Sequence, residues 1–413
     1  MVKIKLRYSK ALMTTKTIPS NSEENGQFQL GQALTVAIGH FIHDVYTAFI
    51  APLLPLIIEK LSISLTMAGA LVSFSQFPSI LNPFIGHLAD RVNVRYFVIF
   101  APAVSATLVA SMGLAPNIYI LALILFLAGI SIAAFHAPAP AVTARVSGDR
   151  VGAGMSLYMA GGELARTLGP LLAVWAASLW GLEGIYRTVA LGWGSTIILW
   201  LRFRKIAGHQ QESHYVQINL RNILWHLKPL LIPLAGFILF RMLAAVCMTT
   251  YLPTFMRMEG ASLKLAGASL SILEAAGVVG ALVSGPISDR IGRKPTLVVI
   301  IAASAPLILI FLNVEGWIQI ATLLAFGFFT LSVGPVLLAL VQDYVPENYR
   351  ATGNGAYMAL SFLIRSAASP LVGFIGDTLG LRTAFWGSAL ISLLAIPAIL
   401  ALPSSPLQLS EDQ

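Results

Sequence analysis

Apolar runs of about twenty residues follow one another along almost the whole chain, separated by short charged or Gly/Pro-containing breaks. A helix of that length crosses the hydrocarbon core of a bilayer. The sequence therefore predicts an all-α membrane protein with twelve transmembrane helices. Their approximate spans are 32–58, 66–88, 96–114, 118–144, 152–179, 185–202, 229–256, 265–287, 295–312, 317–342, 352–376 and 383–402.

The composition agrees with a membrane protein. Hydrophobic residues make up 57% of the chain and charged residues 11%, whereas soluble domains carry about a quarter charged residues. The single cysteine, Cys247, excludes a disulfide framework and a multi-cysteine metal site. We expect no metal and no cofactor. The basic residues are scattered over short turns, which speaks against a nucleic-acid partner.

Two similar decapeptides recur 199 residues apart in this chain of 413 residues, at 86–95 (GHLADRVNVR) and 285–294 (GPISDRIGRK). A repeat at about half the chain length predicts two homologous six-helix bundles, an architecture of secondary transporters. The expected division is an N-terminal tail at 1–30, which does not resemble a cleavable signal peptide, and bundles at 31–202 and 229–403. A linker at 203–228 is expected between the two bundles, and a C-terminal tail at 404–413 is expected after the second bundle.

The distribution of Lys and Arg predicts the orientation. With both termini in the cytoplasm, 18 of the 26 basic residues fall on the cytoplasmic side, five fall outside and three lie within helices. Because positive residues favour the cytoplasmic side, the decapeptides are predicted to be cytoplasmic loops. In each, the leading Gly is expected to end a helix. The Asp is expected either to cap a helix N-terminus or to bind a basic residue of a neighbouring helix in one conformational state only. These gating residues are Gly86, Asp90, Arg91, Gly285, Asp289, Arg290 and Arg293.

The decapeptides resemble the loop signature of the major facilitator superfamily, and the resemblance covers residues 31–403. The first copy departs from the pattern at Asn93 and Val94, where Gly and Arg are usual. The resemblance implies a carrier whose two halves rock about a central site and expose it alternately to each side.

A narrower resemblance is to the fosmidomycin-resistance branch of this superfamily. It rests on 39–46 (GHFIHDVY), 134–138 (AFHAP), and 161–172, which carries Gly-Gly-Glu and Gly-Pro-Leu-Leu. The branch implies a proton-driven drug exporter. The chain departs from it after His136, where the branch continues Pro-Glu, and at Glu163 and Arg166, where the branch has small or amide residues.

Placing an ionisable side chain at the centre of the bilayer costs about 2.5–3.5 kcal/mol of free energy, so each such residue is a candidate for a functional role. His40, His43 and Asp44 share one face of the first helix by their spacing. We expect Asp44 to exchange a proton, with a histidine as relay or as substrate contact. In the architecture that the superfamily resemblance implies, the first and seventh helices line the central path, so Arg241 of the seventh helix is expected to pair with Asp44. The alternative is a capping or packing role for Asp44.

The fifth helix carries Glu163 and Arg166 at i, i+3, and Glu274 and Arg365 form a comparable set in the other half. Either Glu163 and Arg166 compensate one another structurally, or the glutamate exchanges a proton while the arginine holds an anionic group. Three arginines within the membrane favour an anionic or zwitterionic solute. His136, beside two helix-bending prolines, is either hydrogen-bonded packing or part of the site.

An enzyme is not expected, because the sequence lacks a phosphate-binding loop, a metalloprotease helix and a nucleophile elbow. The expected function is a proton-coupled antiporter exporting small toxic or anionic compounds. Alternatives are a proton-coupled uptake symporter for an organic anion, a lysolipid flippase, and a receptor or scaffold. The expected partners are a small-molecule substrate, protons and the lipid bilayer, with the protein a monomer. The resemblance implies a bacterial inner membrane as the location.

Overall fold

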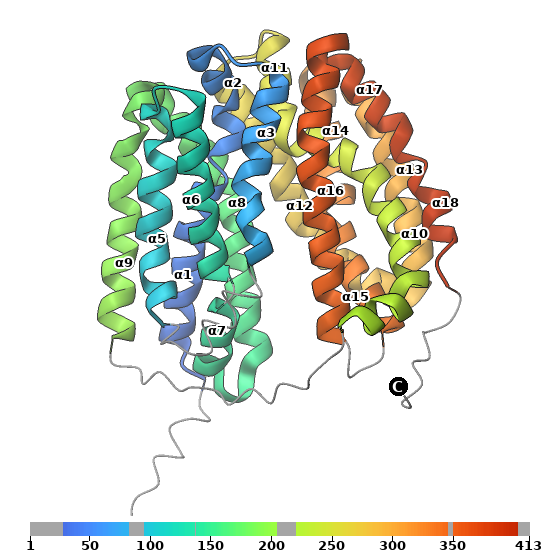
Figure 1. Ribbon diagram of the computed structural model, residues 1–413, viewed down its shortest axis with the longest axis horizontal. Helices are drawn as coiled ribbons and strands as arrows, with labels where there is room; N and C mark the ends of the chain where they lie inside the picture. The colour runs from blue at the N-terminus through green and yellow to red at the C-terminus, as the bar shows by residue number, and fades with distance from the viewer. Residues whose placement is uncertain (1–27, 82–94, 137, 205–219, 346–349, 404–413) are drawn as a thin grey trace, which may run out of the picture.

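The computed structural model describes residues 28–81, 95–136, 138–204, 220–345 and 350–403, which form two helical bundles side by side (Figure 1). The first bundle contains α1 (Leu30–Thr47), α2 (Ile50–Leu61), α3 (Leu65–Gln76), η1 (Phe77–Leu81), α5 (Arg95–Ala110), η2 (Ser111–Leu114), α6 (Ile118–His136), α7 (Ala139–Ser147), η3 (Gly148–Arg150), α8 (Val151–Gly184), η4 (Ile185–Thr188) and α9 (Val189–Phe203). The second contains α10 (Leu220–Val246), η5 (Cys247–Tyr251), α11 (Leu252–Met258), α12 (Leu263–Ile291), α13 (Arg293–Phe311), α14 (Gly316–Leu331), α15 (Val333–Tyr344), α16 (Arg350–Leu379), α17 (Leu381–Ser392) and α18 (Ala395–Leu400).

The twelve predicted crossings are accounted for by these helices. Ten helical stretches within the described residues are long and apolar enough to cross a membrane. One of them, Ala153–Phe203, holds two crossings, because its helix is divided at Gly181, where φ is 71°. The remaining crossing, expected at 66–88, is described as far as α3 and η1, which ends at Leu81. The predicted all-α membrane fold is confirmed.

Two helix irregularities follow from proline. Pro52 lacks an N–H, and its ring crowds the carbonyl four residues earlier, so the first crossing breaks between α1 and α2. Pro253 has the same effect on the seventh crossing, where the π-helix η5 separates α10 from α11. Single-turn π-helices occur frequently at functional sites.

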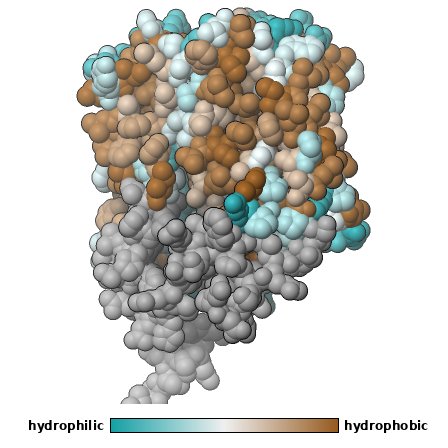
Figure 2. Space-filling model, turned by 45° about the vertical axis from the view of Figure 1, so that its right-hand side comes forward, coloured by the Kyte–Doolittle hydropathy of each residue, from teal (hydrophilic) through white to brown (hydrophobic). Residues whose placement is uncertain are grey.

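The outer surface is apolar over most of its height, with hydrophilic residues at its upper rim (Figure 2). Many large apolar side chains among the described residues are strongly exposed, such as Leu282 at 72% and Trp317 at 77%. Soluble monomers rarely expose extended apolar patches. The described surface is therefore suited to lipid.

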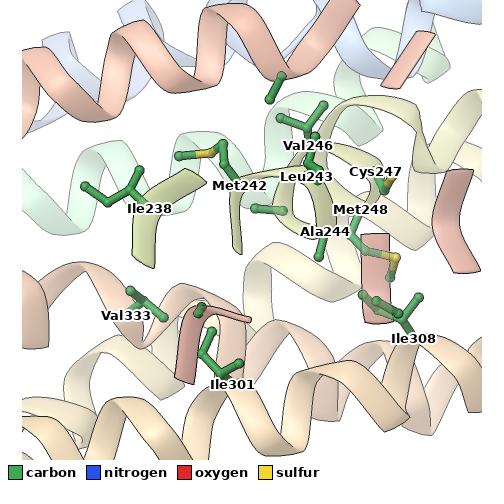
Figure 3. Packing of buried hydrophobic residues seen from close by; sticks show 14 of the residues in the cluster. Ile238, Met242, Leu243, Ala244, Val246, Cys247, Met248, Ile301, Ile308 and Val333 are labelled. Carbon is green, nitrogen blue, oxygen red and sulfur yellow. The ribbon is translucent and has the colours of Figure 1, made fainter. Parts of the chain in front are cut away.

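The core of the second bundle is built around α10 and η5 (Figure 3). Met242 and Met248 are buried in the same cluster as Ile301 and Ile308 of α13 and Val333 of α15. Flexible methionines fill irregular spaces well, and η5 makes this stretch of the helix irregular. The first bundle has its own buried clusters, one of them around Tyr46 and Phe49.

The most extensive contacts between the bundles are those of α3 with α16, α8 with α12, and α2 with α11. Ser73 of α3 donates a hydrogen bond of 2.5 Å to the carbonyl of Ser366 in α16. Closer to the start of α3, the Tyr251 hydroxyl lies 2.9 Å from the carbonyl oxygens of Leu65 and Ser369. We call the end at which α3 begins and α16 ends the closed end.

Gly285 does not end a helix, so that expectation is wrong. α12 continues through it to Ile291, because a glycine within a helix still forms the backbone ladder. The turn is made instead at Gly292, whose φ of 95° strongly favours glycine. Gly86, Asp90 and Arg91 of the first decapeptide lie outside the described residues.

Candidate functional site

Three histidines surround the carboxylate of Asp44 inside the first bundle. The Asp44 Oδ1 atom lies 2.8 Å from His43 Nδ1 and 3.2 Å from His136 Nε2. The Asp44 Oδ2 atom lies 3.2 Å from His40 Nε2. We call His40, His43, Asp44 and His136 the histidine–aspartate cluster. The i, i+3, i+4 spacing predicted that the three α1 members share a face, and α6 adds His136.

Contacts on the far side of each imidazole fix the cluster. His40 Nδ1 donates to the backbone carbonyl of Tyr158 at 2.7 Å, and the Tyr158 ring stacks on the His40 ring. His43 Nε2 lies 3.1 Å from Ser105 Oγ, and its ring stacks on Phe135. His40, His43 and Asp44 are buried, whereas the side chain of His136 is 35% exposed. His136 therefore connects the cluster to the accessible surface of the protein.

The expected pairing of Asp44 with Arg241 is wrong. Asp44 lies among the three histidines, and Arg241 instead donates to the carbonyl of Thr330 in α14 at 3.2 Å. The polar face of α1 turns toward α6 and α8 of its own bundle, which separates the two charges. The proton-relay role expected for Asp44 stays a prediction.

A second charged cluster joins the two bundles. Arg166 of α8 bonds to the Glu163 carboxylate one turn away. The Nε atom of the same guanidinium lies 4.0 Å from Oε2 of Glu274, which is in α12. We call Glu163, Arg166 and Glu274 the glutamate–arginine cluster. All three are predicted site residues, and the structure shows which carboxylates the arginine meets.

Arg365 and Arg241 extend this charged region into the second bundle. Arg365 of α16 donates to Thr249 Oγ1 in the π-helix η5 at 3.2 Å and lies within electrostatic range of Glu274. Arg241 in turn lies within electrostatic range of Arg365 and Tyr357. The three arginines expected within the membrane therefore share one region, in which an acidic solute group would find positive charge on both bundles.

The second decapeptide forms contacts within its own bundle. Arg293 lies 2.5 Å from an Asp289 oxygen and 2.9 Å from an Asp343 oxygen in α15, and it donates to Ser288 Oγ. These residues line a surface groove of about 510 Å³. Arg290 is exposed. The gating role expected of this loop stays a prediction.

Two residues with clear contacts between the bundles are not among the predicted site residues. Asp377 accepts hydrogen bonds from the backbone N–H groups of Leu65 and Thr66 at 2.8 Å each, and Tyr251 approaches the Leu65 carbonyl. The partners of both are backbone atoms, which every residue carries. Only the position of Asp377 near a helix end could have drawn attention to it.

Comparison with protein families decides the class of the molecule. The model of the Major Facilitator Superfamily matches residues 36–369. The chain belongs to this superfamily. Its members are transporters and not enzymes. The expectation that the chain is a superfamily transporter and the expectation that it is not an enzyme are both confirmed.

Among relatives within this superfamily is the fosmidomycin resistance protein of Escherichia coli (strain K12). It is 22% identical over 370 residues, which are 88% of this chain and 91% of the relative. The multidrug resistance protein MdtG of Rahnella sp. (strain Y9602) is 27% identical over 375 residues, 86% of this chain and 89% of its own. The resemblance to a drug-exporting branch is confirmed.

Solved superfamily structures have the same fold. The inward-facing, unoccupied structure of a bacterial homolog of the human lysosomal transporter Spinster matches with a TM-score of 0.77 and 15% identity, covering 91% of this chain and 98% of the other. A D-xylose–proton symporter matches with a TM-score of 0.73 and 14% identity, covering 92% and 99%. At such identities the likeness concerns the fold alone.

Proposed function

We propose that this superfamily member is a proton-coupled antiporter that exports small anionic compounds carrying a hydrogen-bond donor. In this proposal the bundles at 31–202 and 229–403 rock against one another, with 1–30, 203–228 and 404–413 as tails and linker. With both termini in the cytoplasm, the closed end faces the outside of the cell.

The observation that carries the proposal is the state of Glu274. Its Oε2 atom is buried, has no hydrogen-bond partner, and lies 4.0 Å from the Arg166 Nε of the other bundle. An unsatisfied buried carboxylate oxygen is costly. It is stabilised when it either takes a proton or accepts a hydrogen bond from a solute.

These two ways of satisfying Glu274 exclude one another. A solute whose acidic group binds Arg166 or Arg365 can place a donor group on the ionised Glu274 oxygen. Protonation of that oxygen removes the acceptor and releases the solute, which is the exchange that an antiporter needs. The charged groups facing Glu274 are Glu163 and Arg166 of α8 and Arg365 of α16.

Substrate-induced proton release tests this coupling directly. Purified protein in weakly buffered detergent is mixed with fosmidomycin or with members of a small panel of anionic drugs, and the pH is followed. We expect about one proton released per bound solute, and none with Glu274→Gln. The matched control is Glu59→Gln, an exposed carboxyl at the end of α2.

Growth of a pump-deficient bacterium on the same drugs tests the direction of transport. Expression of the chain is expected to confer resistance that disappears with Glu274→Gln or Arg365→Ala. Proton uptake on binding, together with accumulation of the compound in cells, would replace the exporter by the uptake symporter. Absence of resistance with the protein present in the membrane would refute drug export.

A further inference from the structure

The histidine–aspartate cluster holds metal-ligand atoms at metal-site spacing. The His40 Nε2 atom lies 3.2 Å from Asp44 Oδ2 and the His136 Nε2 atom lies 3.2 Å from Asp44 Oδ1, and all three groups offer ligand atoms within 4.8 Å of one another. In a tetrahedral zinc site with bonds of about 2.0–2.1 Å, ligand atoms are about 3.3 Å apart. We propose that His40, Asp44 and His136 bind a divalent transition-metal ion of the Zn²⁺ or Co²⁺ class.

The hydrogen bond on the far side of His40 prepares it as a ligand. A carbonyl oxygen only accepts, so the bond to the Tyr158 carbonyl places the ring proton on Nδ1. In the neutral ring, Nε2 then presents its lone pair toward the Asp44 carboxylate. This arrangement, in which the outer nitrogen donates to a carbonyl, is the usual support of a metal-bound histidine.

The geometry between His40 and Asp44 favours a metal ion over a shared proton. His40 Nε2 is buried and has no hydrogen-bond partner, although the carboxylate oxygen is 3.2 Å away. The nitrogen and the oxygen are thus close without being aligned for a hydrogen bond. A cation between the two would satisfy both of them at once.

The surroundings indicate an exchangeable site with one open position. His43 Nδ1 is held by Asp44, so three ligands remain for the ion: two imidazole nitrogens and one carboxylate. That set suits Zn²⁺ and other divalent first-row metals. The side chain of His136 is 35% exposed and provides the way in for the ion.

This inference departs from the expectation that the chain has no metal site. That expectation rested on the single cysteine and on the absence of a metal-ligand motif in the sequence. His40 and Asp44 are four residues apart, but the third ligand comes from α6, 92 residues farther along the chain. A site assembled from two helices in this way leaves no local sequence signature.

Binding of Zn²⁺ and Co²⁺ by the purified full-length protein, without a polyhistidine tag, tests the proposal. Calorimetry is expected to show one Zn²⁺ per chain, and bound Co²⁺ to show visible bands of a low-coordinate ion. His136→Gln, at the accessible edge, and Asp44→Asn are expected to weaken Zn²⁺ binding by at least about tenfold, since each removes a ligand. Melting curves establish that both variants are folded.

Two controls make the outcome specific. Replacing His209 and His214 by Gln removes two other histidines and should leave the Zn²⁺ affinity unchanged within about twofold, as should Glu274→Gln. No saturable binding, or unchanged affinity in a folded His136→Gln variant, would overturn the proposal. Because binding is measured without transport, failure here leaves the proposed export function untouched, and failure of export leaves the metal site untouched.

Discussion

Thr66 binds Asp377 twice across the two bundles, through its backbone N–H at 2.8 Å and its hydroxyl at 2.6 Å. The other Asp377 oxygen accepts from the N–H of Leu65. Ser64 accepts from the next free N–H, that of Met67. The first turn of α3, whose N–H groups have no partners within the helix, is thus completed by a carboxylate from the other bundle. These bonds must break when the closed end opens.

Asp377→Asn is expected to destabilise the closed end. The carboxamide keeps the size, but it has one acceptor oxygen and directs donor hydrogens toward the N–H groups of α3. Loss of about 1.4 kcal/mol shifts the conformational equilibrium by about tenfold. Spin labels at Tyr119→Cys and Trp317→Cys, in a Cys247→Ala background, report the distance between the bundles at this end and should show a larger long-distance population.

Asp343→Asn is the matched control, because Asp343 pairs with Arg293 within its own bundle. It should leave the label distances at the closed end unchanged. An unaltered distance distribution in Asp377→Asn would show that these bonds do not hold the bundles together.

Gly69→Ala is expected to open the same end more strongly. A Cβ at this position would overlap the Tyr251 hydroxyl and the Ser369 carbonyl, and the latter belongs to the rigid backbone of α16. α3 and α16 must then move apart, so the same spin labels should report longer distances than in Asp377→Asn. Gly194→Ala, where nothing lies within 4 Å of the new Cβ, is the control. Unchanged distances in Gly69→Ala would contradict the close approach of these helices.

The helix positions could be predicted because the bilayer imposes one length on every apolar run. The expected crossing at 295–312 corresponds to α13 at Arg293–Phe311, and that at 383–402 to α17 and α18. The division of the first crossing at Pro52 and the π-helix before Pro253 were not predicted. They depend on how neighbouring helices satisfy the backbone groups that proline leaves free.

The site could be predicted only where its residues share a helix. The spacing of His40, His43 and Asp44 places them on one face, and Glu163 reaches Arg166 one turn away. The partner of Arg241 was predicted wrongly, since it depends on the rotation of α1 and α10 about their own axes. The pairing of Arg166 with Glu274 depends on the docking of the two bundles, which no local pattern encodes.

Tyr46→Phe is expected to lower the stability of the first bundle by about 1 kcal/mol. The Tyr46 hydroxyl is buried and donates to the Thr188 carbonyl in η4 at 2.5 Å, tying α1 to the last crossing of this bundle. Thermal unfolding in detergent should show a lower midpoint. Tyr119→Phe, at a position that is 82% exposed, should leave the midpoint unchanged. Equal midpoints for wild type and Tyr46→Phe would show that the bond contributes nothing measurable.

Arg166→Lys separates the role of charge from that of geometry in the glutamate–arginine cluster. The arginine uses two different nitrogens, one toward Glu163 and one toward Glu274, so a single ammonium cannot meet both carboxylates in the same arrangement. The positive charge is kept, but the planar fork for an acidic solute is lost. In proteoliposomes we expect the apparent KM for an anionic substrate to rise at least about tenfold, equivalent to about 1.4 kcal/mol.

Arg257→Lys is the control, because Arg257 is exposed and bonded to the Ala261 carbonyl, and this variant should transport normally. Normal kinetics in Arg166→Lys would mean that only the charge of Arg166 is used, and full transport in Arg166→Ala would remove this residue from the substrate site.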